Sequence, residues 1–201
     1  MPRQVFDYDP PDRFVAGTVG QPGSRTFFLQ ASAGTRLTSV ALEKTQVSVL
    51  AERVEELLDE VVRRTGGQAP VPALTPAAIE DTAPLLTPIE EEFRVGTMSL
   101  AWDGDTERVV IECFAEGMTV GDDEPTDPID PIDPDDPADP GDLDETGDGS
   151  VLRVSLTGAG ARAFAKRALA VVAAGRPPCP FCGNPLDPEG HVCPRANGYR
   201  R

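Results

Sequence analysis

Histidine is nearly absent from this 201-residue sequence, in which His191 is the single one. Histidine is the side chain that most often moves protons in enzymes near neutral pH, so its scarcity limits the chemistry on offer. If His191 binds a metal, Ser–His triads and other histidine-based acid–base sites are excluded. An enzymatic site would then depend on arginine or on carboxylates, for which Glu43, Asp103 and Glu112 are the candidates.

Several well-known signatures are also missing. The sequence has no P-loop, no dinucleotide-binding glycine fingerprint and no Gly-x-Ser-x-Gly elbow. No apolar run approaches the length of a membrane span, and the first residues lack the apolar core of a signal peptide. We therefore expect a cytoplasmic protein without a membrane span. In that reducing compartment the four cysteines are expected to bind metal or to stay as free thiols.

Basic residues are missing altogether from one long tract. The formal net charge is −16, but residues 122–148 contain 13 acidic side chains and no Lys or Arg, which leaves −3 for the rest. Asp-Pro recurs there at every third residue, a pattern that favours extended polyproline II and buries too little apolar surface to fold by itself. We predict a disordered acidic loop insertion over 119–150. The alternative, a calcium loop, is disfavoured because the EF-hand pattern is absent.

The remaining sequence begins with three short apolar segments and a helix. Apolar residues at steps of three and four predict a helix over 45–64, which Thr45 caps and Gly66-Gly67 ends. Residues 66–91 contain five prolines and predict an irregular connection. The apolar segments are separated by Gly-containing turns, as antiparallel strands are, and comprise 13–19, 25–31 and 37–43.

The second half repeats this order. A helix ending near Ala174 keeps the phase of the first at an offset of 114 residues. We therefore predict an α+β core over 1–175, built from a duplicated βββα unit, with a six-stranded, mainly antiparallel sheet and two helices on one face. The offset rises from 83 before the acidic tract to 114 after it, which places the tract in a hairpin loop. The matching strings are Phe93–Thr97 with Phe14–Thr18, Arg108–Ile111 with Arg25–Phe28, and Val151–Leu156 with Leu37–Leu42.

The segment 176–201 carries the strongest chemical signal. Cys179-Pro-Phe-Cys182-Gly places two thiolates on one tight turn, and His191 and Cys193, one residue apart, face the same side of an extended segment. Three sulfur ligands and one nitrogen ligand suit tetrahedral zinc better than Mg²⁺ or Ca²⁺. We predict a small zinc knuckle that holds one structural ion, because four protein ligands leave no open position. The alternative is a set of free thiols beside a surface histidine.

Two other features have a plain structural explanation and a functional one. Cys113 lies beside Glu112 with no base expected nearby, so we interpret it as a small core residue rather than a nucleophile. Gly158-Ala-Gly160 opens the second helix and could bind a phosphate on its amides, although such a string more often only begins a helix.

The chain resembles a family of bacterial proteins catalogued as the domain of unknown function numbered 3090. Two stretches carry the resemblance: the opening from Arg3-Gln-Val-Phe-Asp7 to Leu42-Glu-Lys-Thr-Gln46, and the ending from Pro178-Cys-Pro-Phe-Cys-Gly183 to Gly190-His-Val-Cys-Pro-Arg-Ala-Asn-Gly-Tyr-Arg200. The acidic insertion departs from the family's usual shorter loop. The resemblance implies no established activity. Genes of this family tend to lie near those of phosphatase-like and lipid-kinase-like proteins, which implies a link to phosphoryl chemistry.

Our leading hypothesis is a binding or adaptor module that presents Arg195, Tyr199 and Arg200 on its zinc-stabilised tail to a protein or phosphorylated partner. A second hypothesis is an enzyme acting on a phosphorylated small molecule. A third is a nucleic-acid binder, but residues 176–201 carry a net charge of only +2, which is small for phosphate-driven affinity. The structural alternative for the tail is that Tyr199 packs on the core and the arginines pair with acids.

Overall fold

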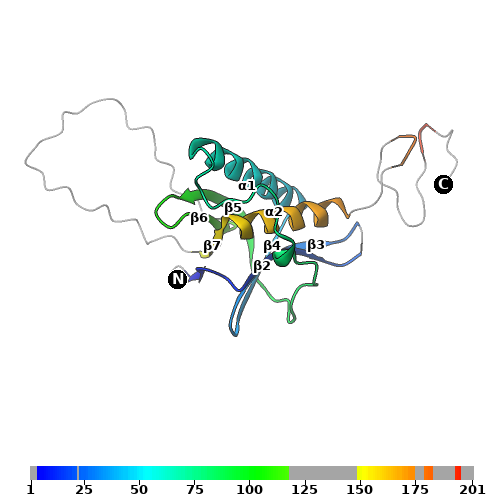
Figure 1. Cartoon of the computed structure of the whole chain (residues 1–201). Helices are drawn as coiled ribbons and strands as arrows, with labels where there is room; N and C mark the ends of the chain where they lie inside the picture. The colour runs from blue at the N-terminus through cyan, green and yellow to red at the C-terminus, as the bar shows by residue number, and fades with distance from the viewer. Residues whose placement is uncertain (1–3, 22, 118–148, 175–178, 183–192, 196–201) are drawn as a thin grey trace, which may run out of the picture.

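The computed structural model describes residues 4–21, 23–117, 149–174, 179–182 and 193–195. These residues form an α+β fold (Figure 1). The predicted acidic loop insertion lies outside the described residues apart from its last two. The strands are β1 (Gln4–Tyr8), β2 (Arg13–Val19), β3 (Thr26–Ala33), β4 (Arg36–Leu42), β5 (Glu91–Asp103), β6 (Arg108–Ala115) and β7 (Ser150–Thr157); the helices are α1 (Lys44–Arg64), the short 3-10 helix η1 (Ala77–Ile79) and α2 (Gly158–Ala173).

The strands form one mixed sheet of seven in the order β1-β7-β6-β5-β4-β3-β2. The predicted sheet of six mainly antiparallel strands was therefore wrong in number and in pairing. The additional strand is β1, a five-residue edge strand that pairs in parallel with β7. The second parallel contact joins β4 to β5. Parallel neighbours need a long crossover, and here α1 and residues 66–90 provide it.

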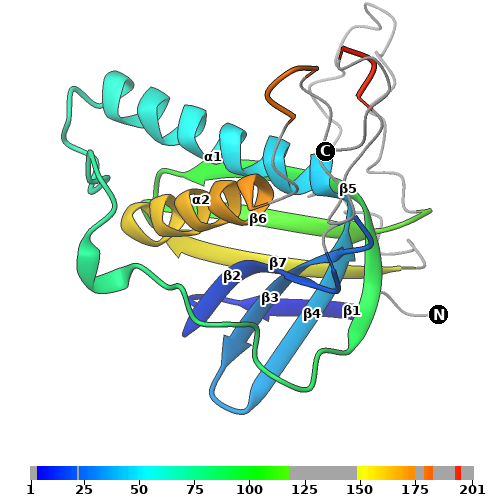
Figure 2. The same cartoon turned by 90° about the vertical axis from the view of Figure 1, so that its right-hand side faces the viewer.

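Apart from the additional strand β1, each half follows the predicted order of three strands and a helix. Both helices lie on the same face of the sheet (Figure 2). With the 114-residue offset, Leu50 corresponds to Phe164 and Val54 to Ala168, and all four side chains are buried. The matches of Phe93–Thr97 with Phe14–Thr18 and of Arg108–Ile111 with Arg25–Phe28 do not agree with the strand pairing.

The pairing shifts the correspondence of the strands within the two halves. Phe27 pairs with Leu42 and Val109 with Leu156, so β3 matches β6 at an offset of 82 rather than 83. The Phe-x-x-Gly-Thr strings of β2 and β5 likewise occupy different positions, because β5 is longer and its hairpin closes at Asp103 and Arg108. Element order and helix phase therefore agree between the two halves better than those strings do.

α1 begins with a reciprocal cap, two residues before the predicted cap residue Thr45. Glu43, not Thr45, is the N-cap residue, and its backbone N–H donates to Oε1 of Gln46 at 2.7 Å. Gln46 Nε2 donates to the carbonyl oxygens of Val95 and Gly96, which fixes the start of α1 against β5. The first turn of the helix is thereby satisfied and tied to the second half of the sheet.

The connecting segment, residues 66–90, first packs along α2 and then, at Leu85 and Leu86, covers the face of β2 and β3 that is opposite the helices. Gln30 points to that face, since its neighbours Leu29 and Ala31 belong to the core under the helices. Its side-chain amide exchanges two hydrogen bonds with the backbone of Leu86, at 2.7 and 3.0 Å. Gly17 lies beneath Leu85 (Figure 2 shows the segment crossing these strands). The predicted irregular connection is thus a packed layer.

Arginines of the core hold this connecting segment in place. Arg13 donates to the Asp81 carboxylate and to the carbonyl oxygens of Ala83 and Pro84. Arg167 of α2 donates to the same carboxylate and to the carbonyl oxygens of Asp81 and Ala83. Two guanidinium groups from distant parts of the chain therefore share one carboxylate.

Replacing Gly17 by alanine should lower the free energy of unfolding by about 1–3 kcal/mol, because overpacking a close contact costs that much. A Cβ at Gly17 would lie 2.6 Å from Cγ of Leu85. Urea denaturation measures the change. Gly104→Ala is the matched control, since no atom lies within 4 Å of its added Cβ, and a change within about 0.5 kcal/mol is expected there. Equal effects of the two substitutions would contradict the packing we describe.

In the described part of the chain, neither helix combines the length and apolar character that crossing a membrane would require.

Candidate metal centre

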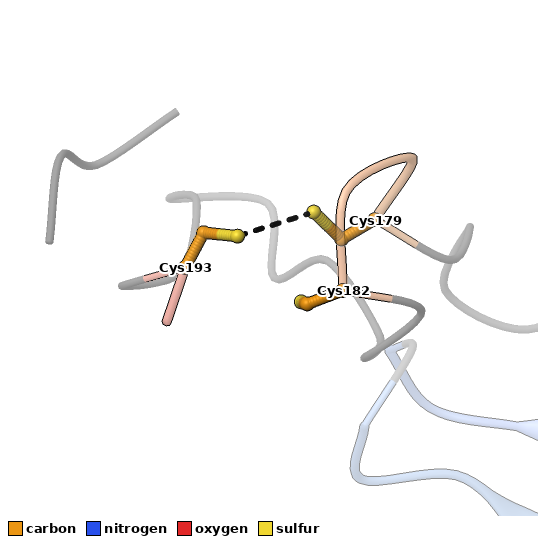
Figure 3. A group of neighbouring side chains, drawn as sticks. All are labelled: Cys179, Cys182 and Cys193. Atoms are coloured by element: carbon orange, nitrogen blue, oxygen red, sulfur yellow. Dashed lines mark hydrogen bonds between the residues drawn. The ribbon is translucent and has the colours of Figure 1, made fainter. Parts of the chain in front are cut away.

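Three cysteine thiols converge in the C-terminal segment. The Sγ atoms of Cys179, Cys182 and Cys193 all lie within 4.8 Å of one another, and the Sγ atoms of Cys179 and Cys193 are 3.9 Å apart (Figure 3). The side chains of Cys179 and Cys193 are almost wholly buried. The predicted sulfur ligands are thus brought together, whereas His191, Tyr199 and Arg200 lie outside the described residues.

The local sequence explains why the first two thiols are adjacent. Residues 180–182 form a turn between Cys179 and Cys182. Arg195, which follows the third cysteine, donates from Nη1 to the carbonyl oxygen of Phe181 at 3.3 Å. This bond joins the Cys193 segment to the turn independently of any metal. The Arg195 side chain is otherwise exposed, as is the Phe181 ring at 45%.

The environment of Cys179 favours its thiolate. Burial alone would raise the pKa of this thiol, but hydrogen bonds from the Cys182 and Phe181 backbones and from the Cys182 and Cys193 side chains hold the pKa below its ordinary value. A thiolate is the form that binds metal.

The geometry and chemistry of the three sulfurs fit zinc. In a tetrahedral site with Zn–S bonds of about 2.3 Å, neighbouring sulfurs are separated by about 3.8 Å. The Cys179–Cys193 separation of 3.9 Å is close to that edge length. Soft thiolate donors select zinc over the hard cations Mg²⁺ and Ca²⁺. The three cysteines could therefore hold a metal ion, with one ligand still to be supplied.

Cys113 does not belong to this cluster. Its side chain is fully buried in the core beneath the helices. Burial, with a smaller contribution from the charge of Glu112, raises the pKa of the Cys113 thiol to about 12. A thiol in this state is not a nucleophile at neutral pH, which agrees with its interpretation as a core residue.

The three candidate carboxylates each have a structural partner and lie apart. Glu43 caps α1 and pairs with Arg94 at the start of β5. Glu112 accepts hydrogen bonds from Ser99 and Arg153. Asp103 accepts hydrogen bonds from Asp105 and Thr106 in the β5–β6 turn, and those from Thr106 lead the causes that lower the pKa of the carboxyl.

The positions of these partners along β5 separate the carboxylates in space. Residues 94, 99 and 103 of one strand are about 13–17 Å apart in successive steps at ~3.3 Å per residue. Three groups spaced in this way cannot act on one reacting atom. The carboxylate-based active site considered from the sequence is therefore not assembled among these residues.

The glycine string at the start of α2 also has structural roles. The Gly160 amide donates to Oγ1 of Thr157, the N-cap residue, at 3.1 Å. Gly158 is buried, and a Cβ there would lie 2.8 Å from Cγ2 of Val71. Gly160 therefore contributes to the cap of α2, and Gly158 lets the connecting segment pack closely against the start of that helix.

Sequence reasoning missed the network of Arg13, Asp81 and Arg167. These residues lie on β2, on the connecting segment and on α2, so no local spacing links them. Only the prolines near Asp81 signalled that this segment avoids regular structure. The network became recognisable once the connecting segment was placed across β2.

Comparison with known proteins identifies a family and nothing closer. A family model described as "Protein of unknown function (DUF3090)" matches residues 6–193, a range that includes all four predicted metal ligands. No curated protein and no solved structure matches the chain significantly.

Proposed function

This chain belongs to the DUF3090 family of unknown function, and we propose that it is a zinc-binding protein in which one structural ion is held by Cys179, Cys182, His191 and Cys193. The observation that carries the proposal is the convergence of three thiols within 4.8 Å of one another. His191 is the proposed fourth ligand because it lies two residues before Cys193 in the sequence.

A structural role follows from the ligand set. Three thiolates and one imidazole complete a tetrahedron and leave no position for a substrate or water. Cys179, Cys182 and Cys193 belong to none of the described helices or strands, and their side chains are not part of the core cluster beneath the helices. The ion would thus supply the cross-link that the tail cannot obtain from apolar burial. Thiolate ligands require a reducing compartment, which is why we propose a cytoplasmic location.

The zinc-stabilised tail would then work as a binding module. Arg195 and Phe181 are exposed on the turn that the cysteines form, and Phe181 is the largest exposed apolar side chain among the described residues. An exposed aromatic ring next to a guanidinium group suits a protein surface that carries acidic or phosphorylated side chains. Tyr199 and Arg200 are proposed to extend this contact surface.

Thiol accessibility tests the metal site directly. We expect one zinc ion per chain by elemental analysis and slow reaction of all thiols with a disulfide reagent. After chelation, three thiols should react rapidly, while Cys113 should react only in denaturant, because it is buried and its pKa is raised to about 12. Chelation should leave the melting temperature of the core within about 2 °C of its starting value. Protein that binds no zinc, or rapid reaction of three thiols in zinc-loaded protein, would contradict the proposal.

The binding role needs a separate measurement. Native mass spectrometry of protein isolated from its own source should show a stoichiometric protein partner. Phe181→Ala combined with Arg195→Ala should remove that partner while zinc content stays at one ion per chain. Arg53→Ala is the matched control, since its side chain is 68% exposed on α1 and pairs with Glu56 of the same helix. A partner that the double variant retains would show that the tail is not the binding surface.

A further inference from the structure

A cleft lies where the two ends of the sheet approach each other. β1 pairs with β7 only as far as Val154, so residues 155–157 have no strand on that side. β2 is the last strand at the opposite end. The curled sheet brings β2 beside β7 beneath α2 (Figure 2). Between them is a cavity of about 330 Å³, lined by residues 10–15, 155–157, 159 and 160 together with Ile79, Asp81, Ala163 and Phe164.

The apolar part of this seam cleft is preformed. The rings of Phe14 and Phe164 stack with centroids 4.6 Å apart and planes 25° from parallel. Along α2 the cleft is bordered by small residues, Ala159, Gly160 and Ala163, which leave the space open. A volume near 300 Å³ corresponds to the lower end of small-molecule sites. The cleft therefore suits a compact ligand with a flat or ring-shaped apolar body.

Arg13 lines the seam cleft and has one donor atom that the described residues leave unpaired. Its Nε and Nη2 atoms bind Asp81, Ala83 and Pro84. Its Nη1 atom is buried and has no hydrogen-bond partner among the described residues. Buried charged donors are normally paired, because leaving one unpaired costs free energy. An acceptor from a ligand would remove that cost.

The ion-pair cluster around Arg13 carries a net positive charge. Arg13 and Arg167, of which only Arg13 lines the cleft, share the single carboxylate of Asp81, so one positive charge is left in excess. The other acid at the cleft, Asp12, is exposed, and its Oδ2 accepts a hydrogen bond from the Gly34 amide at 2.7 Å. A guanidinium group already fixed by other bonds loses little freedom when it binds one more oxygen.

We propose that the seam cleft binds a small organic molecule with an oxyanion group, a phosphate or a carboxylate, at Nη1 of Arg13 and an apolar body against Phe14 and Phe164. The site is distinct from the metal centre and does not depend on zinc. It gives the chain a ligand of the chemical class that the second sequence hypothesis envisaged, without a claim of catalysis.

Titrations monitored by amide NMR test the site with four probes. Phenyl phosphate and benzoate combine a ring with each kind of oxyanion, whereas benzyl alcohol has a ring without charge and inorganic phosphate has charge without a ring. We expect the tighter of the two aromatic anions to shift Ala159, Gly160 and Ala163 and to bind about tenfold more tightly than benzyl alcohol or inorganic phosphate. The ratio of the dissociation constants of phenyl phosphate and benzoate identifies the preferred oxyanion.

Three variants locate the binding. Arg13→Gln should lower the affinity for the tighter-binding aromatic anion about tenfold or more. Because that variant also loses contacts to the connecting segment, Ala163→Leu provides a second test, which fills the cleft from a half-buried position and leaves Arg13 unchanged. Arg153→Gln, an exposed arginine on β7 that pairs with Glu112, is the control and should bind as the parent does. Zinc-free protein should also bind as the parent does.

Three results would overturn the proposal. One is parent-like affinity of a folded Ala163→Leu variant for the tighter-binding aromatic anion. Another is a set of NMR shifts that maps away from α2 and β2. Equal affinity for benzyl alcohol and for both aromatic anions would remove the role of Arg13 and would equally refute the oxyanion site.

Discussion

Replacing Cys182 by serine is expected to abolish zinc binding, with the affinity falling by about three orders of magnitude or more. A structural zinc site contributes roughly 10–16 kcal/mol of apparent binding free energy, and a neutral hydroxyl does not replace a thiolate ligand. The Cys182 thiol lies within 4.8 Å of the two other cysteine thiols. Competition with a chromophoric chelator measures the affinity, and elemental analysis measures the stoichiometry.

The chain provides a matched control for this substitution. Cys113→Ala also removes one thiol, but from the core, where the residue is fully buried and outside the cluster. That variant should keep one zinc ion and lose about 1 kcal/mol of stability. If Cys113→Ala loses zinc, or if Cys182→Ser keeps it, the ligand assignment is wrong. His191→Ala tests the fourth ligand in the same assay and should behave as Cys182→Ser does.

Replacing Asp81 by asparagine should lower the free energy of unfolding by about 3 kcal/mol. The substitution leaves Arg13 and Arg167, whose side chains are only 17% and 11% exposed, without a counter-charge. Removing one partner of a buried ion pair costs about 3–5 kcal/mol, and the 30% exposure of Asp81 moves the expectation to the lower end. Urea denaturation monitored by circular dichroism measures the difference.

The same carboxylate predicts a pH dependence. The hydrogen bond from Arg13 leads the causes that hold the pKa of Asp81 below its ordinary value, and the backbone N–H of Ala83 and the charges of Arg13 and Arg167 add to this effect against burial. Because the folded pKa is the lower one, the stabilisation is complete above the unfolded pKa and declines as the pH falls below about 4. Asp81→Asn should flatten the stability profile in that window.

Glu56→Gln serves as the control for both measurements. Glu56 pairs with Arg53 on the surface of α1, where both side chains are more than 60% exposed. Such pairs contribute less than about 1 kcal/mol. A loss of stability in Glu56→Gln as large as in Asp81→Asn would show that the Asp81 network has no special role.

The sequence predicted those features that depend on local periodicity. β2 covers the predicted residues 13–19, and α1 and α2 lie where the apolar spacing placed them. The convergence of the three thiols could be predicted because the spacing of metal ligands is a local signal in the sequence. β1 was missed because a five-residue edge strand shows too little periodicity. The parallel pairing of β4 with β5 was missed because it depends on the path of the connecting segment, which no local pattern specifies.

The tertiary role of arginine was equally invisible in the sequence. Arg13 and Arg167 looked like ordinary charged positions. Yet Arg13 binds a carbonyl oxygen 70 residues away along the chain, and Arg167 binds one 86 residues away, both in the connecting segment. Such bonds form only after the two regions are placed together. Propensity and periodicity concern neighbours along the chain, so they do not report them.

The pairing of β1 with β7 has a consequence for the order of events during synthesis. Gln4–Tyr8 emerge from the ribosome before the other described elements, but their partners Ser150–Val154 emerge only after β2–β6 and α1 have been made. Until then, the backbone N–H and C=O groups of β1 have no strand to pair with, whereas β2, β3 and β4 pair with one another early. Such a long-range closure is slow, and an unpaired strand end invites pairing with other chains. Removal of residues 4–8 should therefore affect the final closure of the sheet more than the initial collapse of the first half.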